Sequence, residues 1–491
     1  MKRITKIYLI VILLTVGCTK MLEKEPIGVV SESSAYVSEN DALQAIVSAY
    51  NVNISYAMDN YSIYDIVTDN ALKGGEGPSD GDWMFDLANF NVNSSNFIAQ
   101  DSWANGFLGV HRSNLVIENV PGIKMDESAK SRIIGEAKFL RAYHYFSLVK
   151  LFGDVPLITN AQVDASKVTR DSKDIVWAQV VKDLTEAADV LPLRSAITSN
   201  ELGRATKGAA QAYLAKAYLY QKNFQQAELW FNKVIESNEY SLDPDFYHIF
   251  TTAGEFGPGN IFEINHAYSA QFTAAQNHAT IVLGSAGMYG YGFCCPSQDF
   301  VDEFEPGDPR LWQTVYKAGD ILPDGRIADV GNSETGYMSL KPYLNLDEYP
   351  PTGDPSNSPK NFIKYRYGML LLWYAEAANE NGNTTQALWA LNEVRKRARQ
   401  GNPSVLPDVA TTNKEQLRVA IWHEQRVEYG MENERFFDLV RQGRAGTVLR
   451  AYSQKYNTTK GSFKDGVNEV LPIPQTEIDL SQGKLTQNPG Y

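Results

Sequence analysis

Two stretches of the sequence share one pattern of apolar and small residues: GRATKGAAQAYLAKAYLYQKNFQQAELWFNKVI (203–235) and LLLWYAEAANENGNTTQALWALNEVRKRA (370–398). The shared positions are Leu214, Ala215, Tyr218, Ala227, Phe231 and Val234 in the first, and Tyr374, Ala375, Ala378, Ala387, Leu391 and Val394 in the second. The alanines allow two antiparallel helices to approach closely, and the larger side chains fill the space between them. Asn223 and Gly382-Asn383 fall where the turns are expected.

These offsets are those of the tetratricopeptide repeat, and further helical patterns flank them. Residues 177–191 carry apolar residues at steps of three and four, which predicts an amphipathic helix. Residues 133–152 are also apolar at helical spacing and end at Gly153, with Pro156 soon after. Trp103 and Trp177 lie on such helical stripes and are expected in the core. The sequence therefore predicts an all-α, tetratricopeptide-like helical-repeat scaffold.

Two loop-rich stretches, about 69–105 and 240–362, interrupt the helical patterns. The second is rich in Gly, Pro, Asp and Tyr, and only 261–264 and 280–283 suggest short strands. Long loops inside a compact domain are usually functional or disordered. Their many aromatic residues favour ordered, functional loops.

The N-terminal residues predict export and lipid attachment. Lys2, Arg3 and Lys6 precede an apolar run that is too short to span a bilayer, and Cys18 follows a small residue. This arrangement is typical of a bacterial lipoprotein, in which the cysteine carries lipids; an ordinary signal peptide is the alternative. We expect a signal peptide at 1–17, a lipid-anchored tether at 18–35 and one folded domain at 36–491.

Charge and the remaining cysteines exclude several functions. The net charge of −13 disfavours nucleic acid and direct adhesion to anionic lipid. No His or Cys cluster has the spacing of metal ligands: His423-Glu424 resembles the start of a zinc-protease helix, but position 427 is Val. We expect no cofactor, no metal ligand and no catalytic residue, although the sequence does not decide whether a structural calcium is present.

Cys294 and Cys295 form either a vicinal disulfide or two reduced, buried thiols.

Six blocks, in order along the chain, resemble the SusD/RagB family of outer-membrane nutrient-binding lipoproteins. They are FLRAYHYFSLVKLFGDVPL (139–157), the two repeats quoted above, PSQDFVDEFEPGDPR (296–310), HEQRVEYGMENERFFDLVRQGRA (423–445) and LPIPQTEIDLSQGKLTQNPGY (471–491). The chain departs from the family pattern at Gly368, Asn433 and Glu434. The resemblance implies about four tetratricopeptide-like helix pairs that carry a loop-rich lobe. It also implies a lipid-anchored, surface-exposed protein of the outer membrane, which captures oligosaccharides for a TonB-dependent (SusC-like) transporter.

Sugar recognition needs an aromatic face for the C–H side of the ring and polar groups for its hydroxyls. The loops offer such combinations, so we expect ligand-binding residues at Asp69, Asn70, Trp83, Tyr289, Tyr291, Phe293 and Trp312. These positions are not tied to any family motif. The glycan itself is not evident from the sequence.

Charged residues of the last family blocks are expected to be structural. Glu424, Glu428 and Glu432 lie four apart on one helix face, which favours a salt-bridge network with Arg426 and Arg435 over a pair of catalytic carboxylates. Arg435 and Asp438 are expected to form a buried pair at a helix interface. A surface-anchored glycoside hydrolase, a peptide-binding member of the family and a pure scaffold remain the alternative functions.

Overall fold

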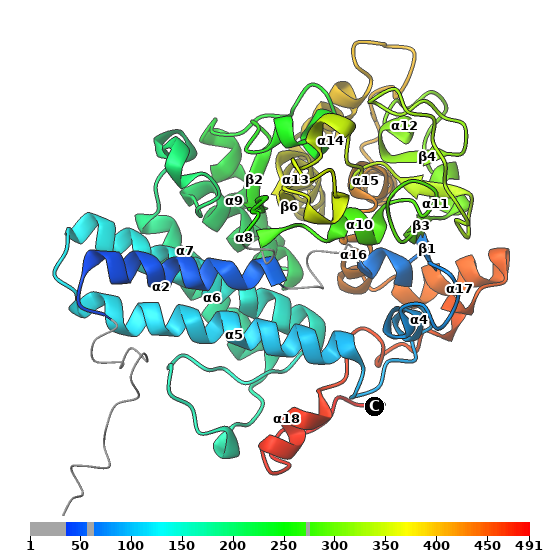
Figure 1. The fold of residues 1–491 in the computed structure, drawn as a ribbon. Helices are drawn as coiled ribbons and strands as arrows, with labels where there is room; N and C mark the ends of the chain where they lie inside the picture. Colours follow the sequence, from blue (N-terminus) through cyan, green and yellow to red (C-terminus); the bar gives the residue numbers. More distant parts are fainter. Residues whose placement is uncertain (1–35, 56–62, 272–274) are drawn as a thin grey trace, which may run out of the picture.

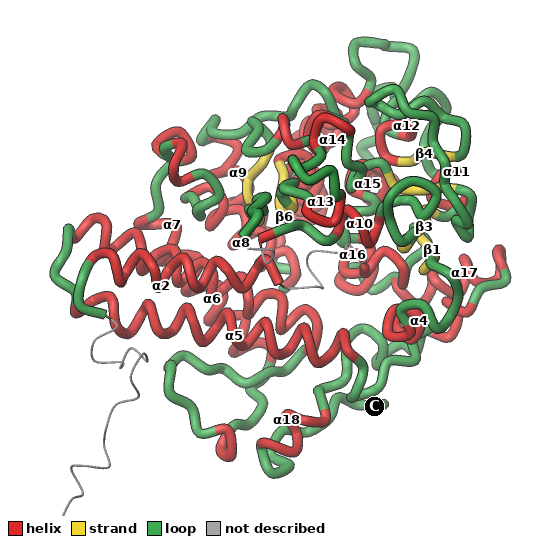
Figure 2. The backbone as a smooth tube through the Cα atoms, viewed as in Figure 1, coloured by secondary structure: helices red, strands yellow, loops and turns green. Residues whose placement is uncertain are grey.

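The computed structural model describes residues 36–55, 63–271 and 275–491 (Figure 1). The predicted lipid-bearing residue, Cys18, and the tether at 18–35 lie outside the described residues. Helices dominate the described residues, and long loops gather around the short strands (Figure 2).

The N-terminal part of the scaffold is a layer of long helices. Helices α2 (Glu39–Asn51), α5 (Phe97–Asn119) and α6 (Glu127–Phe152) lie side by side, and α7 (Lys173–Val190) packs on α6 (Figure 1). Local signals set their ends. The Ser38 and Asp41 side chains form a capping box at the start of α2, and Gly153 ends α6 with a φ of 72° that favours glycine.

The two predicted repeats form helix pairs with the expected turns. Helices α8 (Lys207–Tyr220) and α9 (Phe224–Glu236) pack together, as do α13 (Tyr367–Asn381) and α14 (Thr384–Ala398). The shared positions quoted above are buried except for the partly exposed Tyr218. Helix α9 also packs on α13, so the two repeats stack directly although more than a hundred residues separate them. The all-α repeat fold is confirmed.

The last part of the chain adds four helices, and further short helices lie in the loops. The former are α15 (Lys414–Tyr429), α16 (Arg435–Arg441), α17 (Ala445–Tyr456) and α18 (Gln475–Leu480). The latter are α4 (Asp82–Ala88), α10 (Ala279–Leu283), α11 (Gln298–Asp302) and α12 (Leu311–Thr314). Among the described residues, short 3₁₀ turns such as η3 (Ile63–Val67) and η13 (Thr459–Ser462) fill further connections.

The described strands pair into two-stranded antiparallel sheets. These are β1 (Ala71–Gly74) with β3 (Phe293–Pro296), β2 (Asn260–Ile264) with β6 (Phe362–Arg366), and β4 (Val315–Lys317) with β5 (Tyr337–Ser339). The strand predicted at 261–264 is confirmed as β2. The strand predicted at 280–283 is wrong, because these residues form α10. The Asn277 side chain accepts a hydrogen bond from Ala279 N at 2.8 Å, which forms a local turn just before the helix, whose N-cap residue is His278.

One large apolar core runs through the helices, and a smaller one lies inside the loop-rich lobe, by which we mean residues 240–362. Trp103 and Trp177 are 4% and 7% exposed, which confirms that both belong to the large core. The small core is built on Tyr316, Met338 and Tyr343, with Tyr289 packed against it. The lobe therefore holds its shape partly through its own side chains.

Buried ion pairs join this lobe to the repeats. Glu428 of α15 accepts hydrogen bonds from Arg310 at 2.9 Å, from Arg366 at 2.6 Å and from Arg397. Burial would raise the pKa of Glu428, but the three guanidinium groups lower it far below its usual range. The predicted salt-bridge network on this helix is confirmed, with different partners, since Glu424 pairs with Arg310 and Arg395.

Arg435 and Asp438 are both buried, but they do not pair with each other as expected. Arg435 forms a two-pronged ion pair with Asp69, whereas Asp438 pairs with Arg441 and accepts a hydrogen bond from Tyr429. Their prediction as structural residues is confirmed, and only the partners differ. Helix α16 is thereby fixed to the N-terminal loop that leads into β1.

Candidate functional site

The β1–β3 pair brings the two predicted loop regions together. Ala71 lies opposite Pro296, and Gly74 lies opposite Phe293. Gly74 has a φ of 72°, and a Cβ at this position would lie 2.2 Å from the carbonyl oxygen of Gly292. Only glycine allows this close approach of the two backbones. Segments more than 200 residues apart therefore share one surface.

Lys73 shapes the loop between β1 and α4. Its Nζ donates to the carbonyl oxygens of Gly77 at 3.0 Å and Asp80 at 2.6 Å, and it lies 4.9 Å from the centre of the Phe293 ring. The Asp80 carboxylate accepts from Glu76 N at 2.8 Å. Burial lowers the pKa of Lys73. The side chain is thus used to fold the loop.

A cleft of about 680 Å³ opens beside this loop. Its size is within the range of small-ligand sites, roughly 300–1,000 Å³. Its aromatic residues are Phe85 and Tyr456; its hydroxyl, amide and carboxylate groups come from Glu76, Asn89, Asn332, Glu334, Asn457, Thr458 and Thr459. Phe85 is 39% exposed, so its ring faces the cleft and not the core.

Three segments line the cleft: 72–89, 332–334 and 456–460. The last of these comes from near the C-terminus and is held in place by Lys460. Its buried Nζ donates to the carbonyl oxygens of Ile66 at 2.6 Å, Ala71 at 2.5 Å and Thr68. Burial lowers the pKa of Lys460 to about 7. Ser462 Oγ also donates to the carbonyl oxygen of Asn89 at 2.9 Å, which fastens η13 to the end of α4.

Of the residues predicted to bind ligand, two are well exposed. Tyr291 is 54% exposed and lies next to Gly292, whose carbonyl oxygen accepts from Gly75 N at 3.0 Å. Tyr291 is therefore adjacent to the loop that borders the cleft. Trp312 is 53% exposed on α12, with Lys317 Nζ 5.6 Å from its ring centre. Both remain candidates for ligand contacts, although neither lines the cleft itself.

Trp83 and Tyr289 are only partly available. The Trp83 ring packs against Phe97, with ring centres 5.3 Å apart, on a different side of α4 from Phe85. Tyr289 packs in the lobe against Tyr343, and its hydroxyl accepts from Leu344 N at 2.9 Å. Tyr289 is therefore a support of the lobe and not a protruding platform, which corrects our expectation for this residue.

Three predicted ligand residues are buried, so the expectation that they face a ligand is wrong. Burial would raise the pKa of Asp69, but Arg426 and Arg435 lower it, and both pair with its carboxylate. Asn70 donates to Asp65 and accepts from Arg426. Phe293 is 5% exposed beneath the loop that Lys73 folds. All three therefore support the segments around the cleft through buried contacts and do not face it.

Sequence reasoning missed Phe85 and the entire C-terminal wall of the cleft. A weak signal existed for Phe85, because it stands between Trp83 and Asp86 in one of the predicted loops. No local signal exists for Tyr456, Asn457 or Thr459, which lie at the end of α17 and the start of η13. Tertiary contacts made by Thr459, Lys460 and Ser462 bring this segment to the cleft.

Cys294 and Cys295 are buried thiols that are not joined in a disulfide, so the reading as two reduced thiols holds. Burial raises the pKa of both. Cys295 Sγ lies 3.3 Å from the carbonyl oxygen of Gly292 and 3.8 Å from Met338 Sδ. These side chains pack the strand and are poor nucleophiles.

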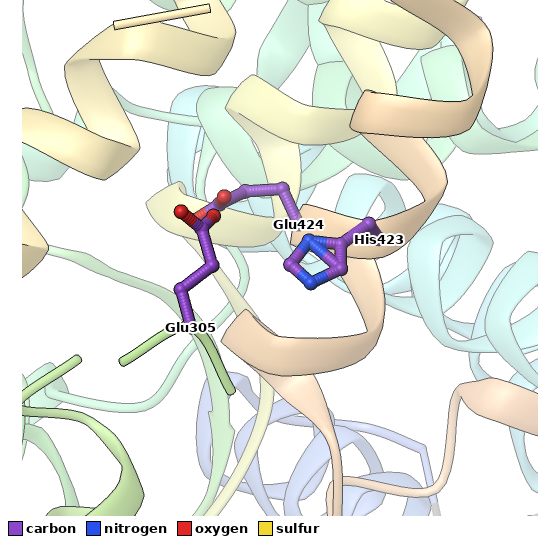
Figure 3. A group of neighbouring side chains, drawn as sticks. All are labelled: Glu305, His423 and Glu424. Carbon is purple, nitrogen blue, oxygen red and sulfur yellow. The ribbon is translucent and has the colours of Figure 1, made fainter. Parts of the chain in front are cut away.

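A possible metal-ligand group elsewhere in the described residues is occupied by ion pairs. Glu305, His423 and Glu424 offer ligand atoms that all lie within 4.8 Å of one another, and Figure 3 shows the two carboxylates facing each other. Arg395 donates to Glu305 at 2.6 Å and to Glu424 at 2.9 Å, and Arg310 donates to Glu424 at 2.6 Å. Since two guanidinium groups already compensate the carboxylates, this group is part of the ion-pair network.

A second, smaller cavity lies beneath α10 and is lined mainly by Ile249, Phe250, Leu283, Phe362 and Ile363. Its volume of about 70 Å³ is far below that of ligand pockets, roughly 300–1,000 Å³. It can hold only a few water molecules. Of these two, the cleft beside β1 is therefore the better candidate for a ligand site.

Comparison with known proteins identifies the family to which this chain is similar. A family model described as "SusD family" matches residues 258–491, and a model described as "Starch-binding associating with outer membrane" matches residues 26–219. SusD-like protein P2 of Formosa agariphila is 27% identical over 520 residues, covering 99% of each chain. The chain belongs to the SusD/RagB family.

Solved structures agree with this assignment. A protein described as a laminarin binding SusD-like protein has a TM-score of 0.80 and 29% identity, covering 93% of this chain and 100% of that one. Surface glycan-binding protein A from Bacteroides fluxus has a TM-score of 0.80 and 25% identity, with the same coverage. The helical scaffold and its loop-rich lobe are thus features that this chain has in common with glycan-binding proteins.

Proposed function

We propose that this protein is a non-catalytic glycan-binding lipoprotein of the cell surface. It captures oligosaccharides and delivers them to a TonB-dependent outer-membrane transporter of the SusC type. The observation that carries the proposal is the cleft beside β1, in which the exposed Phe85 and the partly exposed Tyr456 lie among hydroxyl, amide and carboxylate groups. Family membership and the laminarin binding relative support it.

The chemistry of the cleft suits a sugar. A pyranose ring can stack its C–H face on Phe85, while its hydroxyls donate to and accept from the amides of Asn89, Asn332 and Asn457. Each buried sugar hydroxyl needs such a partner, because an unpaired one weakens binding. Asn89 already bonds to Phe85 O and Thr459 Oγ1. Asn332 and Asn457 are therefore the amides that a purely apolar ligand would leave without a ligand partner.

Calorimetric titration against a panel of oligosaccharides, with chromatography of the products, tests this function. We expect binding to at least one glycan, with no shortening of the chain. Glu76 and Glu334 are the exposed carboxylates of the cleft and are the pair that a hydrolase mechanism would require. Product release that disappears in Glu334→Gln would establish the hydrolase alternative, and no binding at all would favour a pure scaffold.

The anchor is proposed at Cys18. No helix among the described residues is long and apolar enough to cross a membrane, and the family model for 26–219 is described as associating with the outer membrane. Cys18→Ala should release the protein into the soluble fraction and abolish labelling with palmitate. Labelled, membrane-bound Cys18→Ala protein would show that the anchor lies elsewhere.

The transporter partner is proposed from the family resemblance. Pull-down of the full chain from detergent-solubilised outer membranes should recover a much larger β-barrel protein. Failure to recover one, under conditions that preserve complexes of related proteins, would contradict the partnership without affecting glycan binding.

A further inference from the structure

The negatively charged groups around the cleft are accessible to a ligand, whereas the positively charged groups are nearly buried. Among the described residues that line it, the charged ones are Lys73, Glu76, Glu334 and Lys460. Both lysines are nearly buried, 7% and 2% exposed, whereas both glutamates are exposed. A ligand entering the cleft therefore meets carboxylates before it meets ammonium groups.

Lys460 has used all three of its hydrogen-bond donors, and Lys73 has used two of its three. An ammonium group has three N–H donors, and Lys460 places them on the three carbonyl oxygens of Ile66, Thr68 and Ala71. Lys73 donates to two carbonyl oxygens and lies over the Phe293 ring. Lys460 cannot bind a carboxylate or sulfate of a ligand without breaking the contacts that hold the cleft wall, and the nearly buried Lys73 keeps only one N–H beyond those that hold its loop.

Glu334 is well placed to accept from a ligand. One of its carboxylate oxygens, Oε2, accepts from Gly74 N at 3.1 Å, so the group is held at the edge of β1. A carboxylate has room for about four hydrogen bonds and accepts only, which suits neighbouring sugar hydroxyls. A negatively charged ligand group in the same place would repel it.

We propose that the cleft selects uncharged glycans and rejects those that carry uronate or sulfate groups. This inference rests on the proposed glycan-binding function and specifies its ligand class. The neutral hydroxyls of a hexose polymer supply donors for Glu76 and Glu334, whereas an anionic glycan needs a cation that the cleft does not offer.

The test compares each polymer with its own carboxylated form. The full chain, purified in detergent, is titrated at low ionic strength with laminarin, amylose and mannan. Each is used both in its native form and after oxidation of its C6 hydroxyls to carboxylates. We expect at least one native polymer to bind, and its carboxylated form to bind at least about tenfold more weakly. The difference should shrink in high salt, because salt screens exposed charges.

The variants Glu334→Gln and Glu76→Gln locate the effect. Each should improve binding of the carboxylated polymer, whereas Glu393→Gln, at a partly exposed glutamate of α14 that does not line the cleft, should not. Equal or tighter binding of the carboxylated form would overturn the selectivity while leaving glycan binding intact. A double variant that carries both Glu76→Gln and Glu334→Gln should reduce the difference in affinity between the native and the carboxylated polymer. If that difference is unchanged, the selectivity does not come from these two glutamates. If neither form of any polymer binds, the proposed function fails and this inference fails with it.

Discussion

The helical repeats and the loop-rich lobe are held together by different interactions. In the repeats, alanines and large apolar residues such as Leu391 and Phe231 fill the space between neighbouring helices. In and around the lobe, buried charges do comparable work: Glu428 binds three guanidinium groups, and Lys460 binds three carbonyl oxygens. A segment without regular hydrogen-bonded structure must satisfy its backbone groups individually, and long charged side chains do so here.

This contrast explains how one scaffold can carry a specialised site. Packing of repeats depends on shape and tolerates changes at exposed loops. The lobe depends on a few polar contacts between distant segments, so its surface can be arranged precisely around a ligand. The cleft lies where three such segments meet: 72–89, 332–334 and 456–460.

The largest expected effect comes from breaking the ion-pair network between the two regions. Glu428→Gln leaves Arg310, Arg366 and Arg397 without their common counter-charge inside the protein. We expect a loss of roughly 3–5 kcal/mol in the free energy of unfolding, measured by urea denaturation. The matched control, Glu393→Gln, removes an exposed pair with Lys396 and should cost about 0–1 kcal/mol. Equal losses in the two variants would show that the network contributes no more than a surface pair.

Leu391→Ala probes the repeat region alone. Leu391 is fully buried, so the substitution should lower the free energy of unfolding by roughly 2–5 kcal/mol through lost burial and a cavity. The folded fraction should still bind glycan with unchanged affinity, because the side chain is remote from the cleft in sequence and lines no part of it. Weakened binding by fully folded protein would mean that the repeats contribute to the site.

Phe85→Ala probes the cleft alone. Loss of a stacking platform should weaken glycan binding by roughly 1–3 kcal/mol, by analogy with bases that stack on aromatic side chains. This corresponds to about a tenfold to hundredfold increase in Kd. Trp389→Ala is the matched control, since Trp389 on α14 is 40% exposed, close to the 39% of Phe85. The melting temperature should change little in either variant, and equal affinities would remove Phe85 from the site.

The pH dependence of stability tests the lysine that holds the cleft wall. Burial lowers the pKa of Lys460 from 10.5 to about 7 in the folded protein. Between these values the unfolded chain binds more protons, so the contribution of Lys460 to the free energy of unfolding rises with pH, by at most about 1.4 kcal/mol per pH unit. Urea denaturation between pH 7 and 10 should therefore show a steeper rise for the native protein than for Lys460→Met. Parallel curves would contradict a lowered pKa of Lys460 in the folded protein.

The contrast between local packing in the repeats and long-range polar contacts around the lobe also determines which features could be predicted from the sequence. The repeat helices were predictable because the spacing of residues such as Leu214 and Phe231 is local and periodic. The role of Asp69 was not, because its partner Arg435 is 366 residues away. The apolar run at 280–283 fits a strand or a helix equally well by pattern, and in the structure it forms the short helix α10.

The cleft was predicted in part. The stretches around 69–86 and 284–316 do meet, through β1 and β3, but the sequence could not tell the exposed Tyr291 from the buried Phe293 two residues later. Along a regular strand, side chains two residues apart lie on the same face, so alternation alone would give Tyr291 and Phe293 the same exposure. Here the chain turns at Gly292, just before β3 begins at Phe293, and the two side chains differ. Phe85 became visible as a candidate only when its exposure and the cleft around it were known.

Hydrogen exchange with and without a bound glycan tests the central claim most directly, namely that the cleft beside β1 is the binding site and the repeats are its support. A neutral oligosaccharide that binds in titration is added at saturation, and backbone amides are compared by mass spectrometry. We predict slower exchange in 72–89, 332–334 and 456–460, with no change in the repeat helices at 207–236 and 367–398. Protection confined to those repeat helices, with exchange around β1 unchanged, would contradict the account.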